Sequence, residues 1–459
     1  MCIGEVYKIM KFRIFKYLNI MLLILMFCNT ASAVNFYKKD DISTDSVVLY
    51  NTDLDKEVFS KNADKKRSMA STTKIMTYII VAENVADLDN TNIVVSKEIF
   101  GNLENDVAMA DLKDGDVLTV NQLLNCLMVP SGGDAALVLA NYVGGGSVEK
   151  FVEMMNNKAQ ELGCTNTHFS NPHGLYDEQH YSTANDMYKI TKYAIKQQRF
   201  MDICSKSESA VFSDDRKPLI TTNKMIDKVR GGKYYYEYAR GIKTGYLDEA
   251  GYCLISTASK EGTTYMCVAL GAPSFDSDGN KIEDNMAMLD SKKLYEWAFS
   301  SLKLKPLADA KKMLGQTGLN LAWKKDNLLL FPEKSVYTIL PTDFDMSSIK
   351  LELNVPESLD APVETGDLIG NAVFMYEGEK LAEINVVSGE TVPKSWFLLI
   401  VRTIKNILFS KVFLICFTLF LIMSVWYVVV TIKKNMNRKN RKRRNTKKYN
   451  DRPKHQKHR

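Results

Sequence analysis

One uncharged apolar run near the C-terminus constrains this chain more than any other feature. Residues 412–432 are 21 consecutive residues without a charged side chain. At 1.5 Å per residue, a helix of this length measures about 31 Å, which matches the hydrocarbon core of a bilayer at about 30 Å. We therefore predict a transmembrane helix at 412–432. Upstream, residues 393–411 are apolar with scattered Lys and Arg, and we expect this amphipathic segment to lie along the outer membrane surface.

The charge distribution predicts the orientation of that helix. The net charge is +6, but residues 433–459 carry +13 and residues 1–33 carry +3, which leaves −10 for residues 34–432. Because positive charge stays on the cytoplasmic side of a membrane, we expect the basic tail inside and residues 34–411 outside. The acidic body also argues against a nucleic-acid partner, since that partner requires positive charge on the folded part.

The N-terminus has the three-part pattern of a secretory signal peptide. Positive residues up to Lys16 precede an apolar run at 17–28, and the small residues Ala31-Ser32-Ala33 follow. This pattern predicts a signal peptide at 1–33 with cleavage before Val34. A first transmembrane helix is the alternative, but the run is too short to span a bilayer comfortably.

The body divides into two regions of different pattern. Residues 34–303 mix helical and strand-like segments, which predicts an α+β domain with an antiparallel pair of apolar strands. The expected strands cover 46–50, 57–60, 254–258 and 265–270, and the expected helices cover 71–85, 120–128, 147–162, 183–197 and 287–300. Residues 304–392 hold short strand-like pieces punctuated by prolines, which predicts a small all-β domain.

The first motif with chemical meaning is Ser71-Thr72-Thr73-Lys74, at the start of an apolar helix. The i,i+3 spacing places Ser71 and Lys74 on one helical face, within reach of each other. A serine hydroxyl needs a base to become a good nucleophile, and a lysine serves as that base when burial and a nearby cation lower its pKa. Taken alone, the motif is equally consistent with a helix N-cap followed by a solvated lysine.

Each of two further motifs is weak evidence for a functional site when it is taken alone. Lys243-Thr244-Gly245, followed by Tyr246, combines a cation and a hydroxyl that suit a substrate carboxylate with a glycine that permits close backbone approach. In Ser131-Gly132-Gly133, a hydroxyl is available to relay a proton. In isolation, the first is typical of a surface turn into a strand and the second of a plain loop.

The three motifs together, in this order, resemble the S-x-x-K, S-D-N and K-T-G set of penicillin-binding proteins. Their surroundings resemble the D-alanyl-D-alanine carboxypeptidases in particular. The matching stretches are Ala70–Thr77, Pro130–Ala136, Asn171–Leu175, His180–Ala184 and Gly241–Gly245, and Leu359–Val363 with Gly366-Asp367 resembles the β domain of that family. The resemblance implies a penicillin-binding/β-lactamase-like fold, an antiparallel sheet with helices on both sides, followed by the β domain and the membrane helix.

The resemblance also implies a mechanism that needs no metal or cofactor. Ser71 would attack the carbonyl between the two terminal D-alanines of a peptidoglycan stem peptide, with Lys74 as its base. Ser131 would pass a proton to the departing D-alanine. The backbone N–H groups of Ser71 and Tyr246 would hold the oxyanion. Lys243 and Thr244, followed by Gly245, would bind the terminal carboxylate, and β-lactams would acylate the same serine.

One residue departs from the family pattern. The third position of the middle motif is usually Asn in the family and is Gly133 here. The loss of one hydrogen bond in a desolvated site costs about 1–3 kcal/mol, so the departure predicts a slower or differently selective enzyme. Because Gly133 replaces this Asn, the alternative to an active enzyme is an impaired or regulatory pseudoenzyme.

The residues give less support to three other functions. A secreted β-lactamase needs no anchor or β domain, and the chain has no Glu-x-x-Leu-Asn run to place a deacylating water. A zinc peptidase needs closely paired ligands, whereas His168, His173 and His180 form no H-E-x-x-H motif. His173 and His180 are expected to be structural loop residues. A non-enzymatic wall-binding protein would not react with penicillin.

Overall fold

The computed structural model describes residues 36–100, 103 and 107–450. The predicted signal peptide lies outside the described residues. The chain forms two compact units, and the C-terminal β-rich region contributes to both. The first unit runs up to Asp309 and includes Ser335–Glu352 and Ala372–Ile384. The second comprises Ala310–Lys334, Leu353–Asn371 and the chain from Asn385 onward.

A five-stranded sheet in the order β2-β1-β9-β8-β7 organises the first unit. Every neighbouring pair is antiparallel. The strands are β1 (Ser46–Asn51), β2 (Lys56–Lys61), β7 (Ala239–Leu247), β8 (Gly251–Lys260) and β9 (Thr263–Ala272). The predicted hairpin at 46–60 and the predicted pair at 254–270 are both present, and β1 joins them by pairing with β9. Strand β7 is an edge strand, so its outer backbone groups are not used by another strand.

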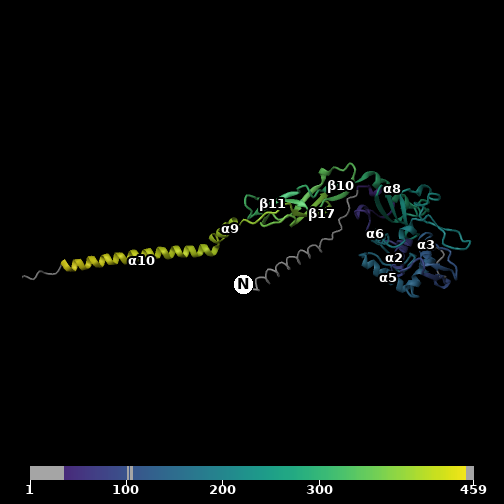
Figure 1. Cartoon of the computed structure of the whole chain (residues 1–459), viewed down its shortest axis with the longest axis horizontal. Coiled ribbons are helices and arrows are strands. Elements are labelled where there is room, and N and C mark those ends of the chain that lie inside the picture. The colour runs from purple at the N-terminus through teal and green to yellow at the C-terminus, as the bar shows by residue number, and fades with distance from the viewer. Residues whose placement is uncertain (1–35, 101–102, 104–106, 451–459) are drawn as a thin grey trace, which may run out of the picture. The chain divides into compact units, whose positions relative to one another are not determined.

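Helices cover both faces of this sheet. Along β1, Val48 faces one hydrophobic cluster while Val47 and Leu49 face the other, as the two-residue period of a strand requires. Helix α8 (Met286–Ser301) packs against β8 and β9 on one face, and α6 (Ala184–Ala194) contacts β1 and β9 from the other. In Figure 1, α8 is set apart from the group formed by α2, α3, α5 and α6. The predicted α+β architecture is confirmed.

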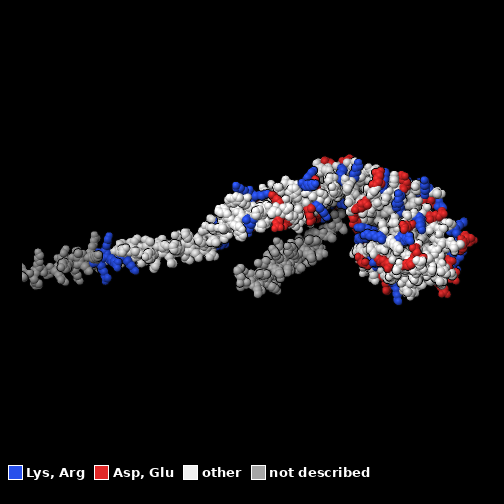
Figure 2. Space-filling model, viewed as in Figure 1, with Lys and Arg blue, Asp and Glu red and all other residues white. Residues whose placement is uncertain are grey.

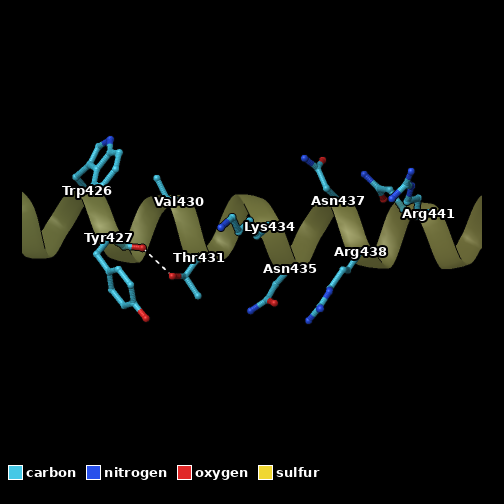
Figure 3. Close-up of a pocket in the computed structure, with 10 residues that line it drawn as sticks. Trp426, Tyr427, Val430, Thr431, Lys434, Asn435, Asn437, Arg438 and Arg441 are labelled. Carbon is cyan, nitrogen blue, oxygen red and sulfur yellow. Dashed lines mark hydrogen bonds between the residues drawn. The ribbon is translucent and has the colours of Figure 1, made fainter.

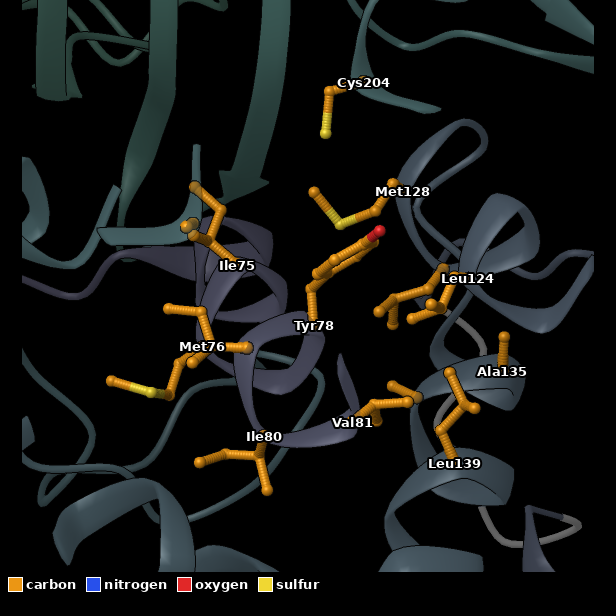
Figure 4. Close-up of a cluster of buried hydrophobic side chains, with 14 of the residues drawn as sticks. Ile75, Met76, Tyr78, Ile80, Val81, Leu124, Met128, Ala135, Leu139 and Cys204 are labelled. Carbon is orange, nitrogen blue, oxygen red and sulfur yellow. The ribbon is translucent and has the colours of Figure 1, made fainter. Parts of the chain in front are cut away.

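Helix α2 (Lys74–Asn84) lies at the centre of the larger cluster. Ile75, Met76, Tyr78, Ile79 and Val81 are fully buried, and each such side chain contributes about 1.5–3 kcal/mol by leaving water. Figure 4 shows Tyr78 and Val81 pointing toward Leu124, Leu139 and Met128 of the neighbouring helices. Leu124 and Met128 belong to α3 (Val120–Met128), and Leu139 belongs to α4 (Gly133–Val143). Helix α5 (Val148–Glu161) also contacts α2, and α7 (Phe200–Cys204) follows α6. Residues 74–81 of α2 are all buried, and this includes its first residue, Lys74.

The remaining elements of this region are short. Pairs β3 (Asn92–Val94) with β4 (Val117–Thr119) and β5 (Glu208–Ser209) with β6 (Leu219–Ile220) are antiparallel. The predicted helix starts at 147 and 183 are N-caps, because Ser147 accepts from the Lys150 N–H and Thr183 from the Asp186 N–H. Single 3-10 turns occur at Lys39–Asp41, Ala70–Thr73, Lys97–Ile99 and Gly232–Tyr234.

The region after α8 is built almost entirely of strands, as predicted. Strands β10 (Leu302–Ala308) and β13 (Val336–Pro341) form one antiparallel pair. A six-stranded sheet has the order β14-β16-β17-β12-β11-β15, in which β15 pairs with β11 in parallel. Its strands are β11 (Gly315–Asn320), β12 (Asn327–Pro332), β14 (Lys350–Asn354), β15 (Ser358–Asp360), β16 (Leu368–Tyr376) and β17 (Glu379–Ser388), with a 3-10 turn at Met346–Ser348. The exact domain boundaries at 303/304 and 392/393 stay predictions.

Two helices complete the described chain. Helix α9 (Trp396–Leu408) has no buried residue, and α10 (Lys411–Asn450) contains the one candidate membrane span within the described residues. Figure 2 shows the apolar stretch of α10 without charged atoms, followed by Lys and Arg side chains. One surface cavity is lined only by α10 residues between Trp426 and Arg441. Figure 3 shows these side chains projecting from different sides of the single helix, so they do not enclose a ligand site. The helix continues into the predicted basic tail.

Candidate active site

The serine and lysine of the first motif contact each other. Ser71 lies in the 3-10 turn Ala70–Thr73, directly before the first residue of α2, Lys74. The Lys74 Nζ lies 2.9 Å from the Ser71 Oγ and 2.6 Å from the carbonyl oxygen of His173, to which it donates. The predicted i,i+3 pair is therefore present, although a 3-10 turn rather than an α-helical turn carries the serine.

Burial determines the protonation of Lys74. The side chain is fully buried, and desolvation lowers its pKa well below the usual lysine range. The charge of Lys243 lowers the pKa further, and the Asp134 carboxylate opposes the shift. Both burial and the Lys243 charge favour the uncharged amine, and an uncharged amine 2.9 Å from a hydroxyl is able to accept its proton.

Lys243 is the second buried cation of the site. It lies on β7, its Nζ donates to the carbonyl oxygen of Thr244 at 2.9 Å, and desolvation lowers its pKa to about 7. Next to it, the Thr244 Oγ1 shares a 2.5 Å hydrogen bond with the Thr222 Oγ1. This bond holds the Thr244 hydroxyl at the cavity wall.

The strand β7 approaches the serine closely because of a glycine. A Cβ added to Gly245 would lie 3.1 Å from the Ser71 amide nitrogen and 3.0 Å from the Ala70 Cβ. Any side chain there would separate the edge strand from the turn that carries Ser71. Tyr246 follows on the same edge strand and lines the same cavity. Glycine at 245 thus brings the backbone of β7 beside the serine.

Ser131 and Ser71 line the same cavity of about 290 Å³. The cavity is lined by Ser71, Val107, Ala108, Ser131, His173, Gly174, Leu175, Thr222, Thr244, Gly245, Tyr246, Leu247, Tyr252, Asn285 and Met288. Ser131 has a left-handed φ of 71°, and its buried Oγ has no hydrogen-bond partner among the described residues. An unpartnered buried hydroxyl in a cavity is available to a ligand. Gly133 does not line the cavity and lies behind Val107 and Ala108.

The loop that binds Lys74 holds two histidines. His173 lines the cavity, its carbonyl oxygen accepts from Lys74, and burial lowers the pKa of its ring to about 3. The His180 Nδ1 accepts from the Ser170 N–H at 3.0 Å, so its Nε2 carries the proton and donates to the Thr73 Oγ1 at 2.7 Å. Burial lowers the pKa of His180 to about 4. Both imidazoles are therefore neutral at neutral pH.

His173 borders the cavity, and the expectation that His173 and His180 are structural loop residues stays a prediction. Sequence reasoning also missed a connection to the serine, in which the Thr73 Oγ1 donates to the carbonyl oxygen of Ala70 at 2.8 Å. Ala70 precedes the serine and has a left-handed φ of 44°. Other cavity residues that it missed are Val107, Ala108, Leu175, Thr222, Leu247, Tyr252, Asn285 and Met288. Leu175 lies in Asn171–Leu175 and His180 in His180–Ala184, two stretches that resemble the family, whereas the other residues belong to no motif of fixed spacing.

Asp134 holds the loop that faces the serine. Its carboxylate accepts from the Ala110 N–H at 3.0 Å and from the Leu112 N–H at 3.2 Å. These bonds occupy the carboxylate, which therefore does not take the place of the amide that Gly133 lacks.

Comparisons with known proteins agree with the motifs. The D-alanyl-D-alanine carboxypeptidase family (Peptidase_S11) matches residues 33–274, and the C-terminal domain of penicillin-binding protein 5 matches residues 316–394. The chain is 30% identical to D-alanyl-D-alanine carboxypeptidase DacF of Bacillus subtilis, over 77% of this chain and 87% of DacF. It is 28% identical to DacA of Escherichia coli K12, over 78% and 85% of the two chains.

Solved structures give the same result. Penicillin-binding protein 5 from Haemophilus influenzae superposes with a TM-score of 0.58 at 25% identity, covering 79% of this chain and all of that one. The Streptomyces K15 DD-transpeptidase superposes with a TM-score of 0.50 at 30% identity, covering 57% of this chain and 100% of that one. With its signature residues gathered around one cavity, the chain belongs to the D-alanyl-D-alanine carboxypeptidase family of serine peptidases.

Proposed function

We propose that this enzyme removes the terminal D-alanine from peptidoglycan stem peptides through an acyl-enzyme on Ser71. The observation that carries the proposal is the 2.9 Å contact between the Ser71 Oγ and the buried Nζ of Lys74, whose lowered pKa makes it a base. The contact opens onto a cavity that also holds the unpartnered hydroxyl of Ser131.

The first half of the reaction forms the ester. Neutral Lys74 takes the proton of Ser71 as the Oγ attacks the carbonyl carbon of the penultimate D-alanine. The N–H groups of Ser71 and Tyr246 stabilise the oxyanion, and the close approach at Gly245 supports this placement. The C–N bond then breaks, and the proton reaches the departing amine of D-alanine through the Ser131 hydroxyl.

The second half releases the shortened peptide. Water attacks the ester carbonyl, Lys74 takes a proton from this water, and the Ser71 Oγ leaves and regains a proton. Before the first step, protonated Lys243 and the Thr244 hydroxyl hold the terminal carboxylate of the substrate. A β-lactam acylates Ser71 by the same attack, but its opened ring stays attached and the ester lasts longer.

The membrane placement is the second part of the proposal. Helix α10 anchors the enzyme with its active site outside the cytoplasmic membrane and its basic end inside. Trp426 and Tyr427 suit the interface, and Lys433, Lys434 and Arg438 follow within about two to three turns. Protease added to right-side-out vesicles should then remove the catalytic region and spare the tail, whereas a cleaved tail would contradict this orientation.

Release of D-alanine tests the activity. The full chain in detergent micelles is incubated with a synthetic pentapeptide ending in D-Ala-D-Ala, and free D-alanine is measured. We expect release by the unaltered enzyme and by Ser68→Ala, and none by Ser71→Ala. Equal release by the Ser71→Ala variant would contradict the proposal.

A further inference from the structure

The segment that faces Ser71 is attached to the first turn of α4. The Gly133 N–H donates to the carbonyl oxygen of Ala108 at 2.7 Å. The Asp134 carboxylate accepts from the N–H groups of Ala110 and Leu112. These bonds give Ala108, and Val107 before it, a defined position over residue 133.

Val107 fills the space of the side chain that Gly133 lacks. A Cβ added to Gly133 would lie 2.3 Å from the Val107 Cγ1, a separation that real atoms do not adopt. The next nearest atoms are the Ala108 oxygen and the Leu103 Cδ1, both at 3.6 Å, which is ordinary van der Waals contact. Gly133 is not among the residues with positive φ, so its backbone accepts any residue. Among the described residues, it is the Val107 side chain that would have to shift before another residue could replace glycine at 133.

Val107 also lines the cavity, with Ser71 and Ser131. Where the asparagine amide of the family pattern would offer hydrogen bonds, this chain offers the two methyl groups of a stiff, β-branched side chain. A polar group of an acyl donor that packs against the Val107 methyl groups would lose its bonds to water without a hydrogen bond from this side chain. An apolar group would instead gain contact area.

We propose that Val107 and Gly133 form a coupled pair that determines specificity. Val107 replaces the side chain of residue 133 in space and provides an apolar wall that selects acyl donors with an apolar group beside the reacting carbonyl. This inference rests on the proposed function for its substrate, but the steric coupling within the pair is independent of activity.

The coupling is tested with Val107→Ala, Gly133→Ala and the double variant, measured by thermal unfolding. We expect Gly133→Ala to lower Tm by about 2–8 °C, because an extra methyl group overpacks the contact with Val107. In the double variant, loss of the Val107 methyl groups should restore most of this difference. Val229→Ala, at a valine with 87% exposure, is the matched control and should not rescue Gly133→Ala. Tm differences that simply add would overturn the coupling.

Specificity is tested with two labelled penicillins, one with a phenylacetyl side chain and one whose acyl group ends in a carboxylate. Val107→Thr keeps the shape and adds a hydroxyl. We expect the ratio of the acylation rate constants, apolar over polar, to fall about tenfold in Val107→Thr and to stay constant in Val229→Thr. An unchanged ratio in Val107→Thr would overturn the specificity role.

These outcomes separate the two proposals. If neither penicillin labels Ser71 in the unaltered enzyme, the proposed function fails and with it the specificity role, while the unfolding experiment still decides the coupling. If Ser71 is labelled but the pair shows no coupling, the inference fails and the proposed function stands.

Discussion

The two walls of the active-site cavity are built differently. On one side, Ser71 and Lys74 lie at the start of a helix that is buried all round, and Lys243 lies on the neighbouring edge strand. On the other side, Ser131 has a left-handed backbone and an unpartnered hydroxyl within the described structure, and a segment attached by hydrogen bonds covers Gly133. The first wall retains the family pattern and the second departs from it.

The difference indicates which wall of the active-site cavity tolerates amino-acid substitution. A substitution of Ser71 or Lys74 on the nucleophile wall removes a group that the proposed chemistry needs. A substitution on the facing wall is compensated by one neighbouring side chain, as Val107 compensates for Gly133. We therefore expect the largest losses of activity on the first wall, and on the second wall a relay role for Ser131 and selection among donors by Val107.

The largest effect is expected for Lys74→Met. Loss of the base should lower the rate constant of acylation by labelled penicillin about 10³-fold. Thermal stability should stay equal or rise, because Met is buried without the desolvation cost of an amine. Lys97→Met, at an exposed lysine, serves as the control. Acylation within tenfold of the unaltered enzyme would show that another group is the base.

On the facing wall, Ser131→Ala should lower D-alanine release about 10²-fold, since one proton relay is lost. The unfolding temperature should not fall, because the Ser131 Oγ has no partner in the described structure. Ser46→Ala is a matched control, since its buried Oγ is also unpartnered there and lies on β1 away from the cavity. Unchanged release in Ser131→Ala would remove this residue from the mechanism.

A smaller loss is expected behind the nucleophile wall. Thr73→Val removes the hydroxyl that joins His180 to the Ala70 carbonyl and keeps the shape of the side chain. We expect acylation to slow about tenfold, because the turn that carries Ser71 loses its support. His180→Ala should act in the same direction, and His168→Ala, whose ring bonds to Gln179 instead, should not. A normal rate in Thr73→Val would contradict the positioning role.

The smallest effect is a pH dependence. Lys243 has a pKa of about 7, so the free enzyme loses this cation as pH rises through 7. The acylation efficiency with a carboxylate-bearing penicillin should fall about fivefold between pH 7 and 8. The neutral methyl ester of the same penicillin should show no such decrease. A profile that stays flat to pH 9 for the free acid would exclude Lys243 from carboxylate binding.

Local patterns predicted most elements of the fold. The helices at 120–128 and 147–162 appear as Val120–Met128 and Val148–Glu161, because a capping box and a Ser147 N-cap define their starts. The helix predicted at 71–85 begins later, at Lys74, because the Ala70 backbone is left-handed and a 3-10 turn precedes it. Helix α4 was not predicted, since its glycine start resembles a loop.

Long-range features were out of reach of the sequence. The pairing of β1 with β9 joins segments some 220 residues apart, and no local period encodes it. The same holds for the site. Ser71 and Lys74 follow from helical spacing, whereas the placement of Lys243 and Ser131 came from the family resemblance. The contact of Val107 with Gly133 depends on tertiary packing and was visible only in the structure.

Covalent labelling of one serine tests the central claim most directly. The full chain is treated with benzylpenicillin, and intact mass and peptide mapping locate the adduct. The account predicts one penicilloyl group on Ser71, its loss in Ser71→Ala and its retention in Ser68→Ala. An adduct on another residue, or no adduct on a folded enzyme, would contradict the account.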